Sequence, residues 1–420
     1  MLYDQREYIK EETCGLTSQC IIFIEEVLLM TYFVGIDIAK YKHDCFIQNH
    51  HGEVIHNSFT FKNTQSGFKE FLSVLNSLDH SQKIKIGLES TGHYGSNLKQ
   101  FLEVNNYDYM EFNPLLIKNY SKSTTLRRTK TDKIDSALIS TFLTTVDYKP
   151  NTNQSYHIHA LKSLSRLRDS LVKQRSQILV RLTNVLDVIF PEYKPFFNKN
   201  LTSKTCLYIL ENYGSPKKIS RMNIDSYSKM KKQLRHTISY PKFEKLKDLA
   251  RNTVGTIDDI YLFELSTLLD IYEKLASKID DIDKQLTEHY LQFHSHIHTI
   301  KGISSVTAAG IYAEFGNISN FETFNQMLAY AGLDPSRNES GEQNHRGHMV
   351  KHGSSHLRQL IMNASDCFAL HNPVVYQYQS KKRNEGKHWR IVQSHVARKL
   401  IRIIFYLEKN DVDFNPSLLR

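Results

Sequence analysis

Hydrophobic and polar positions follow two different patterns along the chain. In the first third, near-continuous apolar runs and strictly alternating segments are typical of strands, and they are followed by amphipathic helical stretches. Strands are predicted at 32–39, 44–49, 53–61, 83–90 and 107–113, and helices at 66–78 and 96–106. A meander of strands followed by strand–helix units predicts an α/β domain in which helices cover a sheet.

From about Ala160 the apolar positions recur at helical spacing. A first stripe, interrupted by Arg168 and Arg175, consists of Leu161, Leu164, Leu171, Ile178, Leu182, Val185 and Ile189. A second alternates steps of three and four through Leu265, Leu268, Tyr272, Leu275, Ile279, Ile282 and Leu286. Such stripes are typical of coiled coils, so two long helices are predicted to pair as an antiparallel arm or to serve dimerisation. Pro191 and Pro195 are expected to end the first helix.

Composition narrows the class of protein. The 420 residues carry a formal net charge of +10, which favours a polyanionic partner such as nucleic acid. The five cysteines form no C-x-x-C pair, which argues against a disulfide framework or a zinc ribbon and fits a reducing cytosol. No apolar run reaches the length of a membrane span, so a cytoplasmic protein without a membrane partner is expected.

The first 30 residues differ from the rest. They have no clear period and lack the basic start of a signal peptide, and the first buried strand follows Met30 directly. We therefore expect Met30 to be the true start and residues 1–29 to be a translated leader. The remaining domains are predicted at 31–150 for the α/β domain, 155–292 for the arm with a Lys-rich insertion, and 293–410 for a mostly helical C-terminal domain.

The C-terminal part opens with "IKGISSVTAAGIYAEFG", residues 300–316. Its glycine, apolar residue and helix start resemble a helix-hairpin-helix, which docks backbone amides onto DNA phosphates, although Ser304 stands where a second glycine is usual. A Gly-, Ser- and Asn-rich segment, residues 336–348, is expected to be a loop. The histidines of "HSHIH", residues 294–298, could bind metal on one face, but a solvated link is the preferred interpretation.

Four acidic residues are predicted to converge. Asp132 and Asp135 are three apart at the expected start of a helix, so they share one helix face. Asp37 lies in the first strand, and Glu89 ends a later one; acids at the ends of neighbouring strands can meet at one edge of a sheet. Together they suit two Mg²⁺ or Mn²⁺ ions for phosphoryl transfer. The alternative is that Asp132 caps a helix and Asp135 is a solvated first-turn acid.

Six motifs follow one another along the chain: "VGIDIAK", "GLESTGHYG", "RRTKTDKIDSALIS", the segment at 300–316, "LAYAGLDPSRNESG" and "VKHGSSHLRQL". In this order they resemble the DEDD transposases of the insertion-sequence 110 family, relatives of the Piv DNA invertases. The resemblance runs from about Thr31 to Leu400. Its most specific parts are "KTDKIDSA" and "AGLDPSRNESG".

The resemblance implies a RuvC-like, RNase H-type N-terminal domain, a coiled-coil arm and a C-terminal domain with a serine nucleophile. It implies that Asp37, Glu89, Asp132 and Asp135 bind the metal and that Ser340 is the catalytic serine. Rival serines in the same region are Ser336, Ser354 and Ser355. The family further implies excision and insertion of an element, guided by an element-encoded RNA, by a dimer or tetramer acting on two DNA duplexes, donor and target.

Basic residues near these motifs are the candidates for binding nucleic-acid phosphates. They are Arg127, Arg128, Lys130, Lys133, Arg346, Lys351 and Arg358. Three other functions stay open. A RuvC-like nuclease would cut branched DNA with water and need no serine. A sugar-kinase or phosphatase relative of the actin-like ATPases is suggested by "VGIDIAK" but lacks a nucleotide loop. A non-catalytic nucleic-acid-binding remnant would show no metal-dependent cleavage.

Overall fold

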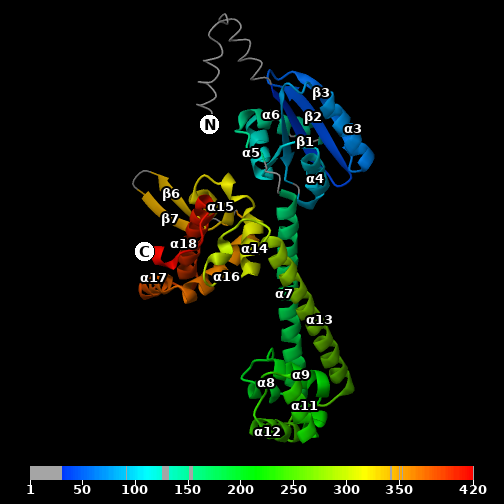
Figure 1. Cartoon of the computed structure of the whole chain (residues 1–420), viewed down its shortest axis with the longest axis vertical. Helices are drawn as coiled ribbons and strands as arrows, with labels where there is room; N and C mark the ends of the chain where they lie inside the picture. Colours follow the sequence, from blue (N-terminus) through cyan, green and yellow to red (C-terminus); the bar gives the residue numbers. More distant parts are fainter. Residues whose placement is uncertain are drawn as a thin grey trace, which may run out of the picture. The chain divides into compact units, whose positions relative to one another are not determined.

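The computed structural model describes residues 31–90, 92–124, 132–150, 155–340, 343–349, 351 and 353–419. The predicted leader at 1–29 lies outside this part. The chain divides into two compact units, Met1–Ile158 and His159–Arg420, which Figure 1 colours from blue to cyan and from green to red. None of the described helices is long and apolar enough to cross a lipid bilayer.

The first unit is built on one mixed sheet. Its described strands are β1 (Thr31–Ile38), β2 (Lys42–Asn49), β3 (Val54–Lys62), β4 (Lys83–Glu89) and β5 (Tyr109–Phe112). They lie in the order β3-β2-β1-β4-β5; β1, β2 and β3 are antiparallel, whereas β4 and β5 run parallel to β1. The predicted α/β domain, three meander strands followed by two strand–helix units, is therefore confirmed. The arrangement is consistent with an RNase H-like domain.

Two helix layers cover the two faces of this sheet. The helices are α3 (Gln65–Asn76), η1 (Gly92–Gly95), α4 (Ser96–Val104), α5 (Pro114–Thr124) and α6 (Asp132–Thr145). Side chains such as Val34 and Ile36 of β1 pack with α3 and α4 in one core. Phe33 and Phe112 pack with Ile117 of α5 and Ile139 of α6 in a second core on the other face. Alternate residues of β1 thus serve opposite cores, as the pleat requires.

The two predicted long helices are present as α7 (Ser155–Ile189) and α13 (Asp259–Tyr290). They run antiparallel, because Arg168 near the start of α7 pairs with Asp283 near the end of α13, whereas Leu186 and Leu265 share a core at the opposite end. Arg168, which breaks the apolar stripe, thus contacts the partner helix through its charge. A coiled coil in the strict sense stays a prediction. The first helix ends two residues before Pro191, as expected.

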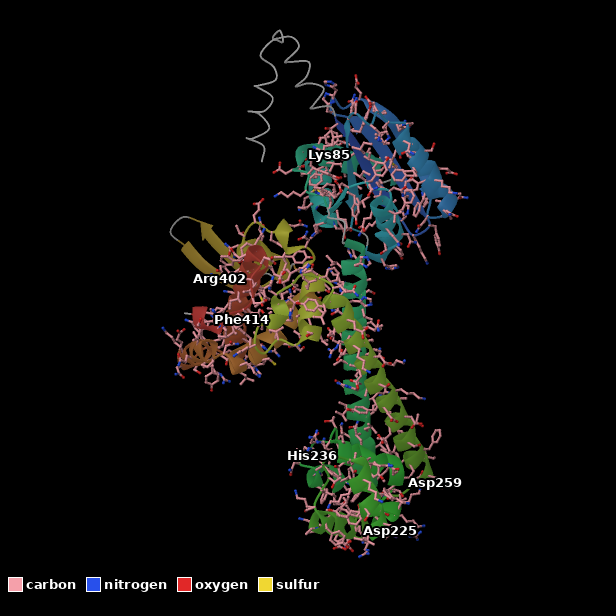
Figure 2. All side chains as sticks on the ribbon, viewed as in Figure 1. Lys85, Asp225, His236, Asp259, Arg402 and Phe414 are labelled. Atoms are coloured by element: carbon pink, nitrogen blue, oxygen red, sulfur yellow. The ribbon has the colours of Figure 1, made fainter. Side chains whose placement is uncertain are left out.

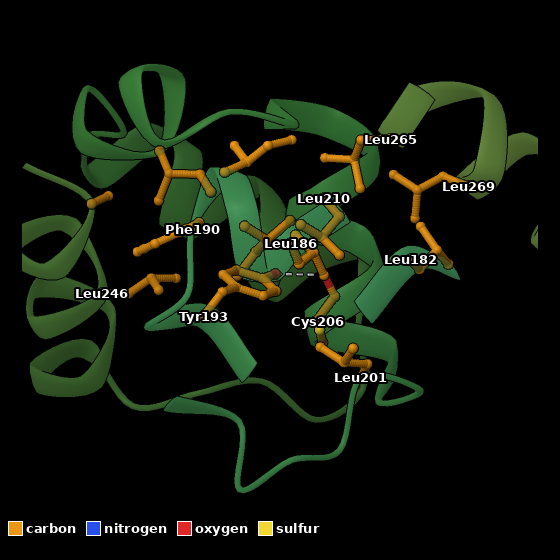
Figure 3. Close-up of a cluster of buried hydrophobic side chains, with 14 of the residues drawn as sticks. Leu182, Leu186, Phe190, Tyr193, Leu201, Cys206, Leu210, Leu246, Leu265 and Leu269 are labelled. Carbon is orange, nitrogen blue, oxygen red and sulfur yellow. Dashed lines mark hydrogen bonds between the residues drawn. The ribbon is translucent and has the colours of Figure 1, made fainter. Parts of the chain in front are cut away.

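The Lys-rich segment between the long helices, where no motif was found, folds into short helices. They are α8 (Tyr193–Phe196), α9 (Lys204–Tyr213), α10 (Pro216–Ser220), α11 (Ile224–Gln233) and α12 (Tyr240–Arg251). Their apolar residues close a core with the ends of α7 and α13 (Figure 3). At its centre the buried Tyr193 donates a hydrogen bond of 2.8 Å to the carbonyl of Cys206.

The C-terminal region is helical apart from one hairpin. Its elements are η2 (Ile297–Thr299), α14 (Ser305–Phe315), η3 (Ile318–Asn320), α15 (Phe324–Ala331), β6 (Pro335–Ser340), β7 (Gln343–Met349), α16 (Ser355–His371), α17 (Pro373–Asn384), α18 (Trp389–Asn410) and η4 (Pro416–Leu418). Ser304, the departure from the helix-hairpin-helix pattern, is the N-cap of α14: its side chain accepts a hydrogen bond from the Thr307 amide.

Candidate functional site

Asp37 and Glu89 stand side by side at one edge of the sheet. The last paired residues of the parallel strands β1 and β4 are Ile36 and Leu88, each directly before one of these acids. Each acid comes two residues after a glycine that faces α6: Asp37 follows Gly35, and Glu89 follows Gly87. Since side chains alternate along a strand, both carboxylates project toward the α6 face. Both are partly buried.

Gly35 fixes how closely α6 approaches this sheet. A Cβ atom built on Gly35 would lie 2.3 Å from both the carbonyl oxygen of Ser136 and the amide nitrogen of Ser140. The helix is held there by a hydrogen bond of 2.9 Å from the Ser140 hydroxyl to the Phe33 carbonyl. Asp135 immediately precedes Ser136, so it lies on the turn of α6 that crosses β1. The sequence motif therefore places its second aspartate next to the strand that carries Asp37.

Asp132 is the first residue of α6, as predicted, but its side chain lies outside the described part. Among the side chains that are described, no three carboxylates, histidines or cysteines form a metal-binding group. A metal site at this edge would therefore depend on Asp132. The donor chemistry fits, because Asp37, Glu89 and Asp135 offer the anionic oxygens that Mg²⁺ and Mn²⁺ prefer.

A further carboxylate, Asp44, was not singled out from the sequence. It lies in β2 directly opposite Asp37 in the antiparallel register, so both side chains are on the same face. It is buried, accepts a hydrogen bond from Thr60 and pairs with Lys42 at 3.4 Å. The short turn between the first two predicted strands is the signal that could have indicated this pairing.

The predicted phosphate-binding residues are only partly visible. Arg127, Arg128 and Lys130 lie outside the described residues, and of Lys133 and Arg346 only the backbone is described, in α6 and β7. Lys351 is exposed just before α16. The guanidinium of Arg358 donates a hydrogen bond of 3.3 Å to the Ala331 carbonyl at the end of α15.

Ser340 is the last residue of β6 and pairs with Gln343 of β7. The segment at 336–348, expected to be a loop, thus forms a hairpin; this expectation was wrong. The sequence did not predict these two strands, because the segment is polar throughout and lacks the alternation of apolar and polar positions that indicates a half-buried strand. The side chain of Ser340 lies outside the described part.

Two arginines bond to the segment from the end of α15 to β6, which is called the root of the hairpin below. Helix α15 ends at Gly332, whose φ of 64° is left-handed, with the Leu333 amide bonded back to the Leu328 carbonyl. Arg398 of α18 donates a hydrogen bond of 3.1 Å to the Leu333 carbonyl, and Arg358 holds the carbonyl of Ala331. Cations at the last carbonyls of a helix stabilise it, so the segment entering β6 has a fixed position.

Of the three alternative candidates for the catalytic serine, Ser354 already has a structural role. It is the N-cap of α16, and its hydroxyl donates a hydrogen bond of 2.9 Å to Glu314. Ser355 is the exposed first residue of α16, and the side chain of Ser336 in β6 is not described.

The "HSHIH" segment is partly packed: Ser295 and Ile297 are buried, whereas His294 and His298 are exposed. His296 bonds through its two ring nitrogens to Asp413 at 2.7 Å and Asp411 at 2.9 Å. The hydrogen bonds with Asp413 and Asp411 raise the pKa of His296 above its ordinary value. The expected solvated link thus describes the exposed His294 and His298, whereas His296 is held by the chain end after α18, which folds back onto this segment.

Comparison with known proteins gives a consistent result. Residues 34–191 match the DEDD transposase family of IS110, described as a transposase, and residues 294–380 match the transposase IS116/IS110/IS902 family. The chain is 22% identical to the pilin gene-inverting protein of Moraxella bovis, covering 92% of this chain and 98% of that protein. It is 23% identical to an uncharacterized 43.6 kDa protein of insertion element IS110 from Streptomyces coelicolor, covering 69% and 73%.

Proposed function

Because the chain belongs to the IS110 family of transposases, we propose that it excises and inserts an insertion sequence with divalent metal ions and Ser340 as the nucleophile. It is an enzyme that cuts and rejoins DNA. The observation that carries the metal part of the proposal is the alignment of Asp37 and Glu89 on neighbouring parallel strands, with the Asp135 turn of α6 packed on Gly35.

Divalent ions held by Asp37, Glu89, Asp132 and Asp135 would supply charge stabilisation for the scissile phosphate and the departing oxygen. Mg²⁺ is the expected ion, with Mn²⁺ as a substitute, and four carboxylates are enough for two ions. Asp44 stands across from Asp37, and its carboxylate is bonded to Thr60 and Lys42.

In the covalent step the Ser340 hydroxyl attacks the phosphorus of the scissile phosphodiester. A phosphoserine bond forms, the bond from phosphorus to the 3′ oxygen breaks, and the serine proton ends on that 3′ oxygen. A 3′ hydroxyl of a second strand then attacks the phosphoserine and restores the serine. Bond energy is conserved through both steps, as strand exchange requires, whereas hydrolysis would leave broken ends. The end of a hairpin is a position from which a serine can approach a phosphate closely.

The chain acts, in this proposal, as a dimer or tetramer on donor and target duplexes with an element-encoded guide RNA. The net charge of +10 supports nucleic-acid partners. An apolar groove of about 530 Å³ between α7 and α13 supports assembly, since its lining includes Leu167, Leu171, Ile271, Leu275 and Ile282. Leu167 and Ile271 are 49% and 39% exposed, and a second copy would cover them.

The test is to trap the reaction on a DNA substrate with a nick beside the cleavage site and to map the protein–DNA adduct by mass spectrometry. The adduct is expected on Ser340 and to be absent from the Ser340→Ala variant. An adduct on Ser336, Ser354 or Ser355 would contradict the assignment. Continued cleavage without an adduct by Ser340→Ala would instead support the alternative, a RuvC-like nuclease that uses water.

A further inference from the structure

Positive charge is concentrated at the C-terminal end of the chain. Residues 373–410, which form α17 and α18, contain nine lysines and arginines but only two acidic residues. This excess of seven accounts for most of the formal net charge of +10. All nine cations lie after residue 380, where the match to the second family model ends.

Three lysines from different elements gather at one place. Lys382 of α17 and Lys399 of α18 lie 5.8 and 4.3 Å from the centre of the Tyr378 ring. Lys382 also pairs with Glu385 at 2.8 Å, and Lys387 of the connecting loop pairs with the same carboxylate. Glu385 thus pairs with two of these lysines, and the positive charge of the group exceeds its negative charge.

His395 of α18 lies within the field of these positive charges. Burial lowers the pKa of His395, and the charges of Arg398, Lys387 and Lys382 lower it further, while Glu385 acts in the opposite direction. Arg402 of α18, which is labelled in Figure 2, lies 4.4 Å from the centre of the Phe324 ring in α15. Lys399 of α18 contacts Tyr378 of α17, and the preceding residue, Arg398, bonds to the Leu333 carbonyl at the root of the Ser340 hairpin.

Beside these lysines α17 has a shallow hollow of about 550 Å³. It is lined by Tyr376, Gln377, Ser380, Lys381, Asn384 and Glu385. The Tyr376 ring is 53% exposed. An exposed aromatic ring can stack on an unpaired base, and the amides of Gln377 and Asn384 can bond to its edge. The bases of an intact duplex are already stacked on one another and offer no face to such a ring.

We propose that α17 and α18 form a binding surface for a single-stranded DNA segment, whose phosphates contact Lys381, Lys382, Lys387 and Lys399 and one of whose bases stacks on Tyr376. A strand on this surface would be led to the root of the hairpin that carries Ser340. The choice of DNA as the partner rests on the proposed function, because strand exchange between two duplexes releases unpaired DNA strands.

The experiment measures binding of the full-length protein to a fluorescent 15-nucleotide DNA strand by anisotropy, in EDTA, over a range of salt concentrations. The variants are the triple Lys381→Ala, Lys382→Ala, Lys387→Ala and the single Tyr376→Ala. The matched control removes two exposed lysines of α12, Lys242→Ala and Lys245→Ala. Competition with the same sequence as duplex DNA and as RNA distinguishes the ligands.

The triple variant is expected to bind at least about tenfold more weakly, with a salt slope smaller by about two units, since each phosphate contact contributes about 0.7 on single strands. Tyr376→Ala is expected to lose about fivefold or more with an unchanged slope. The α12 control should bind like the wild type. Unchanged binding by both test variants, or an equal loss in the control, would overturn the proposal.

A loss in the triple variant that is larger for duplex DNA or for RNA than for single-stranded DNA would also overturn it. The result is separable from that of the proposed chemistry. Ser340→Ala is expected to bind the strand normally, and the α17 variants are expected still to form the Ser340 adduct on a nicked substrate, at lower yield. Loss of the adduct in Ser340→Ala bears on the nucleophile alone, and loss of strand binding in the triple variant bears on the surface alone.

Discussion

The guanidinium of Arg166 holds the carboxylate of Glu314 through two hydrogen bonds, of 2.6 and 3.1 Å. Arg166 belongs to α7 and Glu314 to α14, so the pair joins the long helix to the C-terminal region. Lys162 lies 3.5 Å from the same carboxylate, and the Ser354 hydroxyl donates to it. Glu314 is only 1% exposed, and its partners come from α7 and from the N-cap of α16.

This network predicts a pH-dependent contribution to folding. Burial alone would raise the pKa of Glu314, but the hydrogen bond from Arg166, the charge of Lys162 and the Ser354 hydroxyl hold it below its ordinary value. A carboxylate with a lowered pKa stabilises the fold above its ordinary pKa of about 4.3, and this stability is lost as the pH falls through the folded value. Arg166→Ala is expected to cost about 2 kcal/mol at pH 7, measured by urea unfolding.

Two substitutions of glutamate by glutamine test this network. Glu314→Gln should flatten the loss of unfolding free energy between pH 5 and pH 3, because the titrating group is gone. Glu264→Gln, which removes an exposed carboxylate of α13, should leave that loss unchanged. Equal pH profiles for both variants would contradict the role given to Glu314.

Gly35→Ala is expected to destabilise the first unit by about 2 kcal/mol or more, because the new methyl group would meet backbone atoms of α6 that cannot turn away. Gly87→Ala is the matched control: its methyl group would meet side-chain atoms of Phe112, Ile139 and Leu143, which can move. Urea unfolding should rank Gly35→Ala as the more damaging change. The opposite ranking would show that α6 does not depend on contact at Gly35.

Replacing either acid of the α6 motif should abolish DNA strand exchange. Asp132→Asn and Asp135→Asn each remove one anionic ligand while keeping the size of the side chain. Strand exchange in Mg²⁺ and calorimetric titration with Mn²⁺ should both report the loss, with unchanged unfolding by urea. Asp147→Asn, at an exposed acid beyond the end of α6, should behave like the wild type. Normal exchange in either test variant would remove these residues from the metal site.

The triple replacement of Arg127, Arg128 and Lys130 by alanine is expected to weaken duplex binding evenly across sequences. Each lost phosphate contact should lower the slope of log affinity against log salt by about one unit. Fluorescence anisotropy at several salt concentrations measures this slope, and the α12 double variant again serves as the control. An unchanged slope counts against phosphate contacts at these three positions.

A charge placed in the apolar groove of the arm should weaken self-association. Ile271→Glu and Leu167→Glu put a carboxylate where a second copy is proposed to pack, which leaves that charge without a partner in an interface. Light scattering during gel filtration should show a shift toward the monomer. Val180→Glu is the control, because it alters an exposed apolar residue of α7 that does not line the groove; this variant should keep the native mass. A shift toward the monomer in Val180→Glu alone would exclude the groove as the site of self-association.

The sequence by itself determined the succession of strands and helices in the first unit, the presence of the two long helices and the position of the acids at the start of α6. These features rest on local patterns: buried strands read as apolar runs, helices as stripes of period 3.6, and a paired-acid motif as two residues on one helix face. Family motifs added Ser340 as the proposed nucleophile, which no local pattern distinguishes from Ser354. For these parts neighbouring residues carry the information.

Tertiary structure alone decided which of these parts meet. Asp44 lies opposite Asp37 because β1 and β2 pair in one register. The hydroxyl of Ser354 donates a hydrogen bond to Glu314 because α14 packs beside the start of α16. The polar hairpin at 335–349 has no periodic signal, and its root is held by arginines that come from α16 and α18. Such contacts join residues far apart in the chain, and hydrogen bonds and ion pairs between distant residues leave no periodicity in a single sequence.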